Sequence, residues 1–112
     1  MIVEAWSVVI VPFPFTDLPI WKPRPAVVLS KHPFQEQTGR TVLAMITRGV
    51  RTAWPSDVPI SELEPAGLPK PSLVRARIGT VENRFIARQI GVLSEADRAA
   101  VVSAFREILV SF

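Results

Sequence analysis

The distribution of proline is the feature that most constrains how this chain can fold. All eleven prolines lie within the first 71 of 112 residues. A proline cannot donate to a β-ladder, so the strand that begins in SVVIVPFPF should bulge or turn to an edge at Pro12 and Pro14. Two more prolines predict a loop over 16–23, and five predict an irregular stretch over 48–71. Short strands joined by loops are therefore expected before residue 72.

The apolar segments between these breaks predict the strands. The segment 41–47 is almost continuously apolar, which is typical of a central strand. The segment 32–39 is polar and is expected to be a connection. In 72–78 the residues alternate, so Arg75 and Arg77 should share one face. The expected strands cover 7–15, 25–30, 41–47, 58–60 and 72–78, with a final strand pair at 79–82 and 89–93.

The carboxyl end predicts one amphipathic helix. Ser94 and Asp97 have the spacing of a capping box, with Asp in place of the usual Glu or Gln. Apolar residues then recur at helical spacing, namely Val101, Val102, Phe105, Ile108, Leu109 and Phe112. Short strands followed by one terminal helix indicate an α+β protein. The expected architecture is a small, strongly curved antiparallel sheet or barrel, folded as a single domain over 1–112.

The composition excludes several classes of function. With one histidine, His32, and no cysteine, the chain has no plausible zinc site and no thiolate chemistry. Nucleotide-binding glycine loops and serine-hydrolase motifs are absent. No apolar run approaches the length of a membrane span, and the amino terminus lacks a basic leading segment. A reducing cytoplasm is therefore the expected location, and no cofactor is expected.

The basic residues are mostly arginines, ten against three lysines. Arginine presents a planar fork that suits phosphate groups. One basic stretch holds Arg40, Arg48 and Arg51, and a second holds Arg75, Arg77, Arg84 and Arg88. If the two stretches share a face, they form an electropositive groove. A genome that favours arginine codons would explain the same composition.

Arg24 is the most unusual of these cations because it lies between Pro23 and Pro25, at the start of an aliphatic strand. The prolines bias Arg24 toward an extended backbone and lower the entropy lost when its side chain binds a ligand. If 25–30 and 41–47 pair as a hairpin, Thr47 lies at the same end of the sheet as Arg24. A guanidinium and a hydroxyl at one rim make a reasonable anion site, although strand ends commonly carry charge.

Four segments resemble the MazF/PemK family of toxins from type II toxin–antitoxin modules. They are VVIVPFPFTD at 8–17, KPRPAVVLS at 22–30, LAMIT at 43–47 and SLVRARIGTVENRFIARQIGVLSEAD at 72–97. The second is the most recognisable, a basic residue followed by RPA, aliphatic residues and Ser. The resemblance covers nearly the whole chain.

The resemblance implies a small SH3-like barrel of the MazF/PemK/CcdB type, usually a homodimer. Family members are metal-independent, sequence-specific endoribonucleases that cut single-stranded RNA by attack of its own 2′-hydroxyl. A cognate antitoxin neutralises them by laying a mostly disordered segment into the RNA groove. The family's catalytic arginine and threonine fall on Arg24 and Thr47.

The resemblance also suggests which residues contact RNA. The family's RNA-contacting loop falls on Asp17 to Pro23, which places Trp21 and Lys22 near bases and phosphates. The remaining residues expected to bind RNA are Arg48, Arg75 and Arg77. His32 is a candidate proton donor, with a surface loop as the alternative interpretation.

The sequence departs from the family pattern at two places. Trp6-Ser7 replaces the Gly-Asp that often opens the first strand. The acidic residue that many members carry in the later strands has no counterpart in SLVRARIGTVE before Glu82. Two alternatives to a ribonuclease therefore stay open: a barrel that binds nucleic acid or an antitoxin peptide without cleaving, and an assembly module whose arginines are only solvated.

Overall fold

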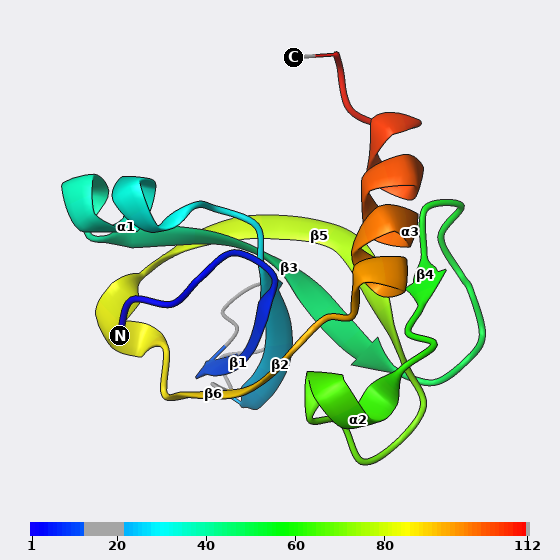
Figure 1. Cartoon of the computed structure of the whole chain (residues 1–112). Helices are drawn as coiled ribbons and strands as arrows, with labels where there is room; N and C mark the ends of the chain where they lie inside the picture. Colours follow the sequence, from blue (N-terminus) through cyan, green and yellow to red (C-terminus); the bar gives the residue numbers. More distant parts are fainter. Residues whose placement is uncertain (13–21, 112) are drawn as a thin grey trace.

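The computed structural model of the chain describes residues 1–12 and 22–111 and shows one curled antiparallel sheet with a carboxyl-terminal helix (Figure 1). The sheet has six strands in the order β4-β5-β3-β2-β1-β6, so β3 is central as its apolar sequence predicts. The elements are β1 (Ser7–Pro12), β2 (Pro23–Val28), α1 (His32–Thr38), β3 (Arg40–Arg48), β4 (Val58–Pro59), α2 (Leu63–Ala66), β5 (Ser72–Glu82), a 3-10 turn (Asn83–Phe85), β6 (Arg88–Val92) and α3 (Glu95–Arg106).

The sheet is buried on both faces because adjacent residues of its inner strands point into different apolar clusters. Val8 and Val27 belong to the cluster that α3 covers with Val101 and Phe105. Val9 belongs to a second cluster enclosed by the curl of the sheet. This arrangement confirms the α+β fold with a strongly curved antiparallel sheet and explains why the strands carry so few polar residues.

The segment 32–39, expected to be a polar connection, is instead largely the helix α1. The reason is Gln35, which is fully buried and is satisfied by three hydrogen bonds. Its amide oxygen accepts from the Val3 backbone N–H at 3.0 Å, and its Nε2 donates to the carbonyls of Val3 at 2.8 Å and Ser30 at 3.1 Å. Gly39, with φ 68°, ends the helix in the left-handed conformation. From the sequence alone, a glutamine that is buried and fully hydrogen-bonded in the fold cannot be told from one in a solvent-exposed loop.

The pairing expected between 79–82 and 89–93 is wrong. Residues 72–82 form one long strand, β5, and β6 pairs with β1 on the other edge of the sheet. The 3-10 turn reverses the chain between them, held by Asn83, whose Nδ2 donates to the Gln35 carbonyl at 3.0 Å. The short helix α2 was not expected either.

The helix α3 begins at the predicted cap, since the Ser94 Oγ accepts from the Asp97 backbone N–H at 3.2 Å. The Asp97 carboxylate accepts instead from the Ser61 backbone N–H at 2.9 Å, its Oγ–H at 2.7 Å and the Glu62 backbone N–H at 3.1 Å. Burial raises the pKa of Asp97, but these hydrogen bonds outweigh it and hold the pKa below its usual value. Asp97 therefore ties the segment after β4 to α3.

The apolar stripe of the carboxyl end is only partly helical. The helix ends at Arg106, so Ile108 and Leu109 lie beyond it and are nearly half exposed. Phe112 lies outside the described residues. Within the part of the chain that the structure covers, no helix is long and apolar enough to cross a membrane.

Trp6 shows what the departure from Gly-Asp means for the backbone. Its φ is 71°, in the left-handed region that a glycine adopts without penalty and that costs other residues about 1–2 kcal/mol. Its N–H donates to the Val28 carbonyl at 2.7 Å, and its ring packs against the cluster under α3. The strained backbone is therefore held by hydrogen bonding and by packing of the indole.

Candidate functional site

The strand register brings Arg24 and Thr47 together. Ala26 on β2 pairs with Met45 on β3, in an antiparallel register. The β2–β3 pairing ends at Ala26 and Met45, and extending its register two residues past that end points from Arg24 to Thr47. Directly opposed residues share a face of the sheet, with Cβ atoms about 5 Å apart. Both residues are half-buried at the rim where β2 begins and β3 ends.

A groove of about 630 Å³ opens at this rim. Its lining residues include five cations and no carboxylate. It is lined by Ile10, Lys22, Pro23, Arg24, Pro25, Ile46, Arg48, Gly67, Leu68, Pro69, Lys70, Ser72, Arg88 and Ile90. We call this the basic groove. Its floor is largely apolar, and its cations come from β2 and the residue before it, from β3 and β6, and from the α2–β5 loop.

Among the residues that the structure describes, no acid pairs with the cations of the basic groove. Within residues 1–12 and 22–111, the ion pairs involve other cations, and none includes Lys22, Arg24, Arg48, Lys70 or Arg88. Thr47 is not among the lining residues, although its neighbours Ile46 and Arg48 are. Arg24 therefore lies where the groove meets the face that carries Thr47. Unopposed cations around an apolar floor favour an anionic ligand with apolar parts, such as a nucleotide strand.

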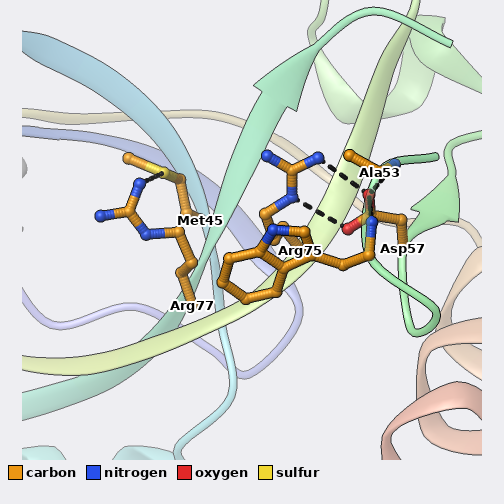
Figure 2. A network of polar contacts seen from close by, with 6 residues as sticks. Met45, Ala53, Asp57, Arg75 and Arg77 are labelled. Atoms are coloured by element: carbon orange, nitrogen blue, oxygen red, sulfur yellow. Dashed lines mark hydrogen bonds and ion pairs between the residues drawn. The ribbon is translucent and has the colours of Figure 1, made fainter. Parts of the chain in front are cut away.

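Arg75 is placed very differently, in a clamp made by residues from another segment (Figure 2). Its Nε and Nη2 donate to the two oxygens of Asp57 at 3.0 and 2.8 Å. The same carboxylate accepts from the backbone N–H groups of Ala53 and Trp54, both at 2.9 Å. The guanidinium also lies 5.1 Å from the centre of the Trp54 ring. The Nε and Nη2 donors of Arg75 are therefore occupied by Asp57.

The charges of this pair stabilise each other. The hydrogen bond from Arg75 holds the pKa of Asp57 below its usual value, burial opposes that shift, and the two backbone N–H groups add to it. The same bond raises the pKa of Arg75. The β5 strand itself carries no acid before Glu82, but Asp57 brings one against it from the segment before β4.

The other predicted site residues are spread over several environments. Lys22 and Arg48 are exposed at the basic groove. Arg77 is half-buried on β5, and its Nη1 donates to the Met45 Sδ at 3.8 Å (Figure 2). His32 begins α1, with Nδ1 3.3 Å from the Glu36 Oε1, and is not among the groove's lining residues. Trp21, with most of the loop 17–23, lies outside the described residues.

Lys70 lines the groove without having been singled out from the sequence, whereas Arg88 was named in the second basic stretch but not among the residues expected to bind RNA. Lys70 lies between Pro69 and Pro71, the same bracketing that marks Arg24, so this signal was present. Arg88 pairs with Ile10 across β6 and β1, a contact that depends on the sheet order. The basic stretch marked Arg88 as a groove candidate, but its place beside Arg24 depends on this distant pairing.

Solved structures of several toxins share this fold. MazF from Deinococcus radiodurans is 21% identical with a TM-score of 0.76, covering 96% of each chain. The toxin MazF-mt6 of Mycobacterium tuberculosis is 24% identical, with a TM-score of 0.73, covering 90% of this chain and 93% of that one. An endoribonuclease solved with its cognate antitoxin, from a mycobacterial species, is 15% identical with a TM-score of 0.74 and covers 94% and 92%. At these identities the likeness establishes the fold alone.

No curated protein sequence matches the chain at a significant level. The family model described as the PemK-like, MazF-like toxin of type II toxin–antitoxin systems matches residues 4–109. This span includes the proline-bracketed Arg24, the strand ending at Thr47 and the terminal helix. The chain belongs to the PemK-like, MazF-like toxin family of type II toxin–antitoxin systems.

Proposed function

We propose that this toxin is a sequence-specific endoribonuclease that cuts single-stranded RNA without a metal ion, with Arg24 and Thr47 as its catalytic residues. The observation that carries the proposal is the position of Arg24. It has no carboxylate partner among the described residues, it lines a groove with four other cations, and it lies on the strand next to Thr47, toward which the β2–β3 register points when extended past its last pair. Membership of the family supports the same activity.

The chemistry requires the RNA's own 2′-hydroxyl to attack the adjacent phosphorus. The bond from phosphorus to the 5′-oxygen breaks, which leaves a 2′,3′-cyclic phosphate and a 5′-hydroxyl. The proton of the attacking hydroxyl passes to solvent, and the departing oxygen takes up one proton, so the reaction is balanced. The pentavalent phosphorane carries extra negative charge on its non-bridging oxygens. A fixed guanidinium stabilises that charge more than the charge of the ground state, which lowers the barrier.

Arg24 suits the role of phosphate clamp and proton donor better than that of general base, because a guanidinium stays protonated at any working pH. Thr47 would position the scissile phosphate through its hydroxyl. Lys22, Arg48 and Trp21 would hold the flanking RNA strand, and Arg77 of β5 would extend this surface. Arg75, although expected to bind RNA, is bonded to Asp57 and is given no role in holding RNA. His32 would reach the phosphate only after a rearrangement of α1, so we assign it no step.

The proposed partners follow from the family and from the charge of the groove. A disordered acidic segment of a cognate antitoxin would occupy the basic groove and exclude RNA. The active form would be a homodimer, acting in the cytoplasm where its RNA substrate is found.

The test is cleavage of RNA by the purified protein in the presence of a chelator, with the product ends mapped. Cleavage should leave cyclic phosphate and 5′-hydroxyl ends, and a 2′-deoxy nucleotide at the cut position should block it. Induced expression should arrest growth, and Arg24→Ala should abolish both effects. Intact RNA with unaffected growth would refute the ribonuclease assignment.

One observation favours a second candidate, a toxin-fold protein that binds nucleic acid or an antitoxin without cleaving. Among the described residues, those lining the basic groove include no histidine and no carboxylate, the usual general acids and bases. This candidate predicts RNA affinity with a steep salt dependence and no cyclic-phosphate product.

A further inference from the structure

The α2–β5 loop and β6 form one wall of the basic groove, and both lie far from Arg24 in the sequence. Lys70 comes from the loop and Arg88 from the first position of β6. Neither forms an ion pair within the part of the chain that the structure covers. Three apolar residues, Ile10, Leu68 and Ile90, line the space between these cations and β2. The groove therefore continues beyond Arg24 as a second cationic wall over an apolar floor.

The loop that carries Lys70 is fixed by its backbone. Pro69 and Pro71 fix their own φ, and Pro71 biases Lys70 toward an extended backbone, as Pro25 does for Arg24. The Ser72 Oγ donates to the Lys70 carbonyl at 2.9 Å. The Gly49 N–H donates to the Pro71 carbonyl at 2.9 Å, which ties the loop to the end of β3 beside Arg48. A lysine held on so rigid a backbone loses less entropy when it binds an anion.

The wall is also fixed against β6 by two glycines. A Cβ atom at Gly67 would collide with the backbone of Ile90, and one at Gly91 would collide with the backbone of Pro65 and Ala66. The backbone of α2 therefore lies directly on that of β6, at a distance that only glycine allows. This contact sets the spacing between the loop bearing Lys70 and the strand bearing Arg88.

From these observations we propose that Lys70 and Arg88 form a second phosphate subsite, which binds the RNA backbone next to the phosphate held by Arg24. The inference rests on the proposed function and identifies where the bound RNA continues beyond Arg24. Lysine acts as a compact point charge on phosphate, and the apolar floor between the subsites takes a ribose or base. These residues bind substrate and take no part in the bond changes.

The experiment measures affinity for a pool of 2′-O-methyl RNA of roughly 12 nucleotides, which the attack of a 2′-hydroxyl cannot cleave. Lys70→Ala and Arg88→Ala should each weaken binding about tenfold, the usual effect of losing one charge-assisted hydrogen bond. Each should also reduce the slope of log affinity against log salt by about 0.7, the value for one phosphate on a single strand. With cleavable RNA, each should raise KM and leave kcat unchanged.

Matched controls separate this role from a general effect of charge. Lys31→Ala removes an exposed lysine just before α1, which lies across the molecule from α2 (Figure 1). Arg106→Ala removes an exposed arginine at the end of α3. Both controls should keep the affinity and the salt slope of the parent, and Lys70→Arg should keep most of the affinity. Thermal melting of each variant checks that it is folded.

The outcomes distinguish this inference from the proposed function. A parent protein that cleaves RNA, together with unchanged binding and KM in Lys70→Ala and Arg88→Ala, overturns the subsite alone. Loss of affinity for an acidic peptide with RNA affinity unchanged assigns this wall to a protein partner and also overturns it. A parent protein that neither binds nor cleaves RNA refutes the proposed function, and the subsite falls with it.

Discussion

Arg24 and Arg75 both lie on strands of the same sheet, yet their surroundings are opposite. Arg24 lies at the rim of a groove with four other cations and has no acidic partner among the described residues. Arg75 forms two hydrogen bonds to Asp57, whose side chain is fully buried, and stacks near Trp54. The first guanidinium is available to a ligand, whereas the second stabilises the loop before β4.

The difference teaches that the role of an arginine is decided by the segments that pack against it. Asp57 lies 18 residues before Arg75 in the chain, and the two meet only because the segment before β4 folds onto β5. A desolvated, doubly bonded pair is a structural element, because breaking it leaves a charge without a partner. An unopposed cation contributes little to stability and keeps its donors for a phosphate.

The largest expected effect tests both halves of the comparison at once. Arg24→Ala should reduce RNA cleavage by about a thousandfold, since it removes a charge directed at the transition state, and should leave stability nearly unchanged. Arg75→Ala should lower stability, because it leaves Asp57 buried without its cation, and should leave the rate of RNA cleavage nearly unchanged. Cleavage rates and thermal melting of the two variants give the comparison directly.

Arg24→Lys is the control for charge alone. A lysine keeps the positive charge but loses the planar fork, so cleavage should recover only in small part. Equal activity of Arg24→Ala and the parent would contradict the catalytic role. A large loss of stability in Arg24→Ala would contradict the expectation that Arg24 contributes little to the stability of the fold.

The next effect concerns Asp57. Asp57→Ala should lower the free energy of unfolding by about 3 kcal/mol, the lower range for breaking a buried ion pair. The melting temperature should fall by roughly 10 °C, as measured by calorimetry or circular dichroism. Asp57→Asn is the matched control, because it keeps part of the hydrogen bonding to Ala53 and Trp54 and should lose less. An unchanged melting temperature would show that the clamp is not structural.

The sequence predicted the features of the fold that depend on neighbouring residues. The central strand 41–47, its antiparallel pairing with 25–30 and the cap at Ser94 follow from apolar runs and local spacing, and all are present, although α1 separates the two strands. The helix α1 could not be predicted in this way, because Gln35 is buried by contacts with Val3, which lies 32 residues earlier. The pairing of β6 with β1 depends on the same kind of distant contact.

The candidate site likewise combines features that local sequence predicts with features that depend on distant contacts. Proline bracketing marked Arg24 and marks Lys70 equally well, because it is a local property of the chain. The alternation in 72–78 gave Arg75 and Arg77 the same expectation of binding RNA. Their contacts differ, with Asp57 in one case and the Met45 Sδ in the other, and both partners come from other segments. Charge in a sequence therefore marks candidates, and distant packing selects among them.

A smaller effect is expected at Thr47. Thr47→Val keeps the shape and β-propensity of the side chain and removes only its hydroxyl, so cleavage should fall roughly tenfold to a hundredfold. Thr47→Ser keeps the hydroxyl and should stay near the parent rate. Single-turnover kinetics with cleavable RNA measure the chemical step. If both variants cleave like the parent, Arg24 acts without the Thr47 hydroxyl.

The smallest effect is the pH dependence of stability, which sharpens the contrast between paired and unpaired charges. Hydrogen bonding to Arg75 lowers the pKa of Asp57 in the folded state, below its unfolded value of about 3.9. A lowered folded pKa contributes stability that is fully present above the unfolded pKa and is lost as the pH falls through the folded pKa. The free energy of unfolding should therefore decline in acid, beginning below about pH 5.

Denaturant unfolding across this range should show the advantage of the parent over Asp57→Asn shrinking as the pH falls. Asp97 has a pKa shifted in the same direction, so some acid dependence should persist in Asp57→Asn. Arg24→Ala should follow the parent curve throughout, because none of the ion pairs within residues 1–12 and 22–111 involves Arg24. A constant gap between the parent and Asp57→Asn down to the acid limit would mean that Arg75 does not stabilise the ionised carboxylate of Asp57.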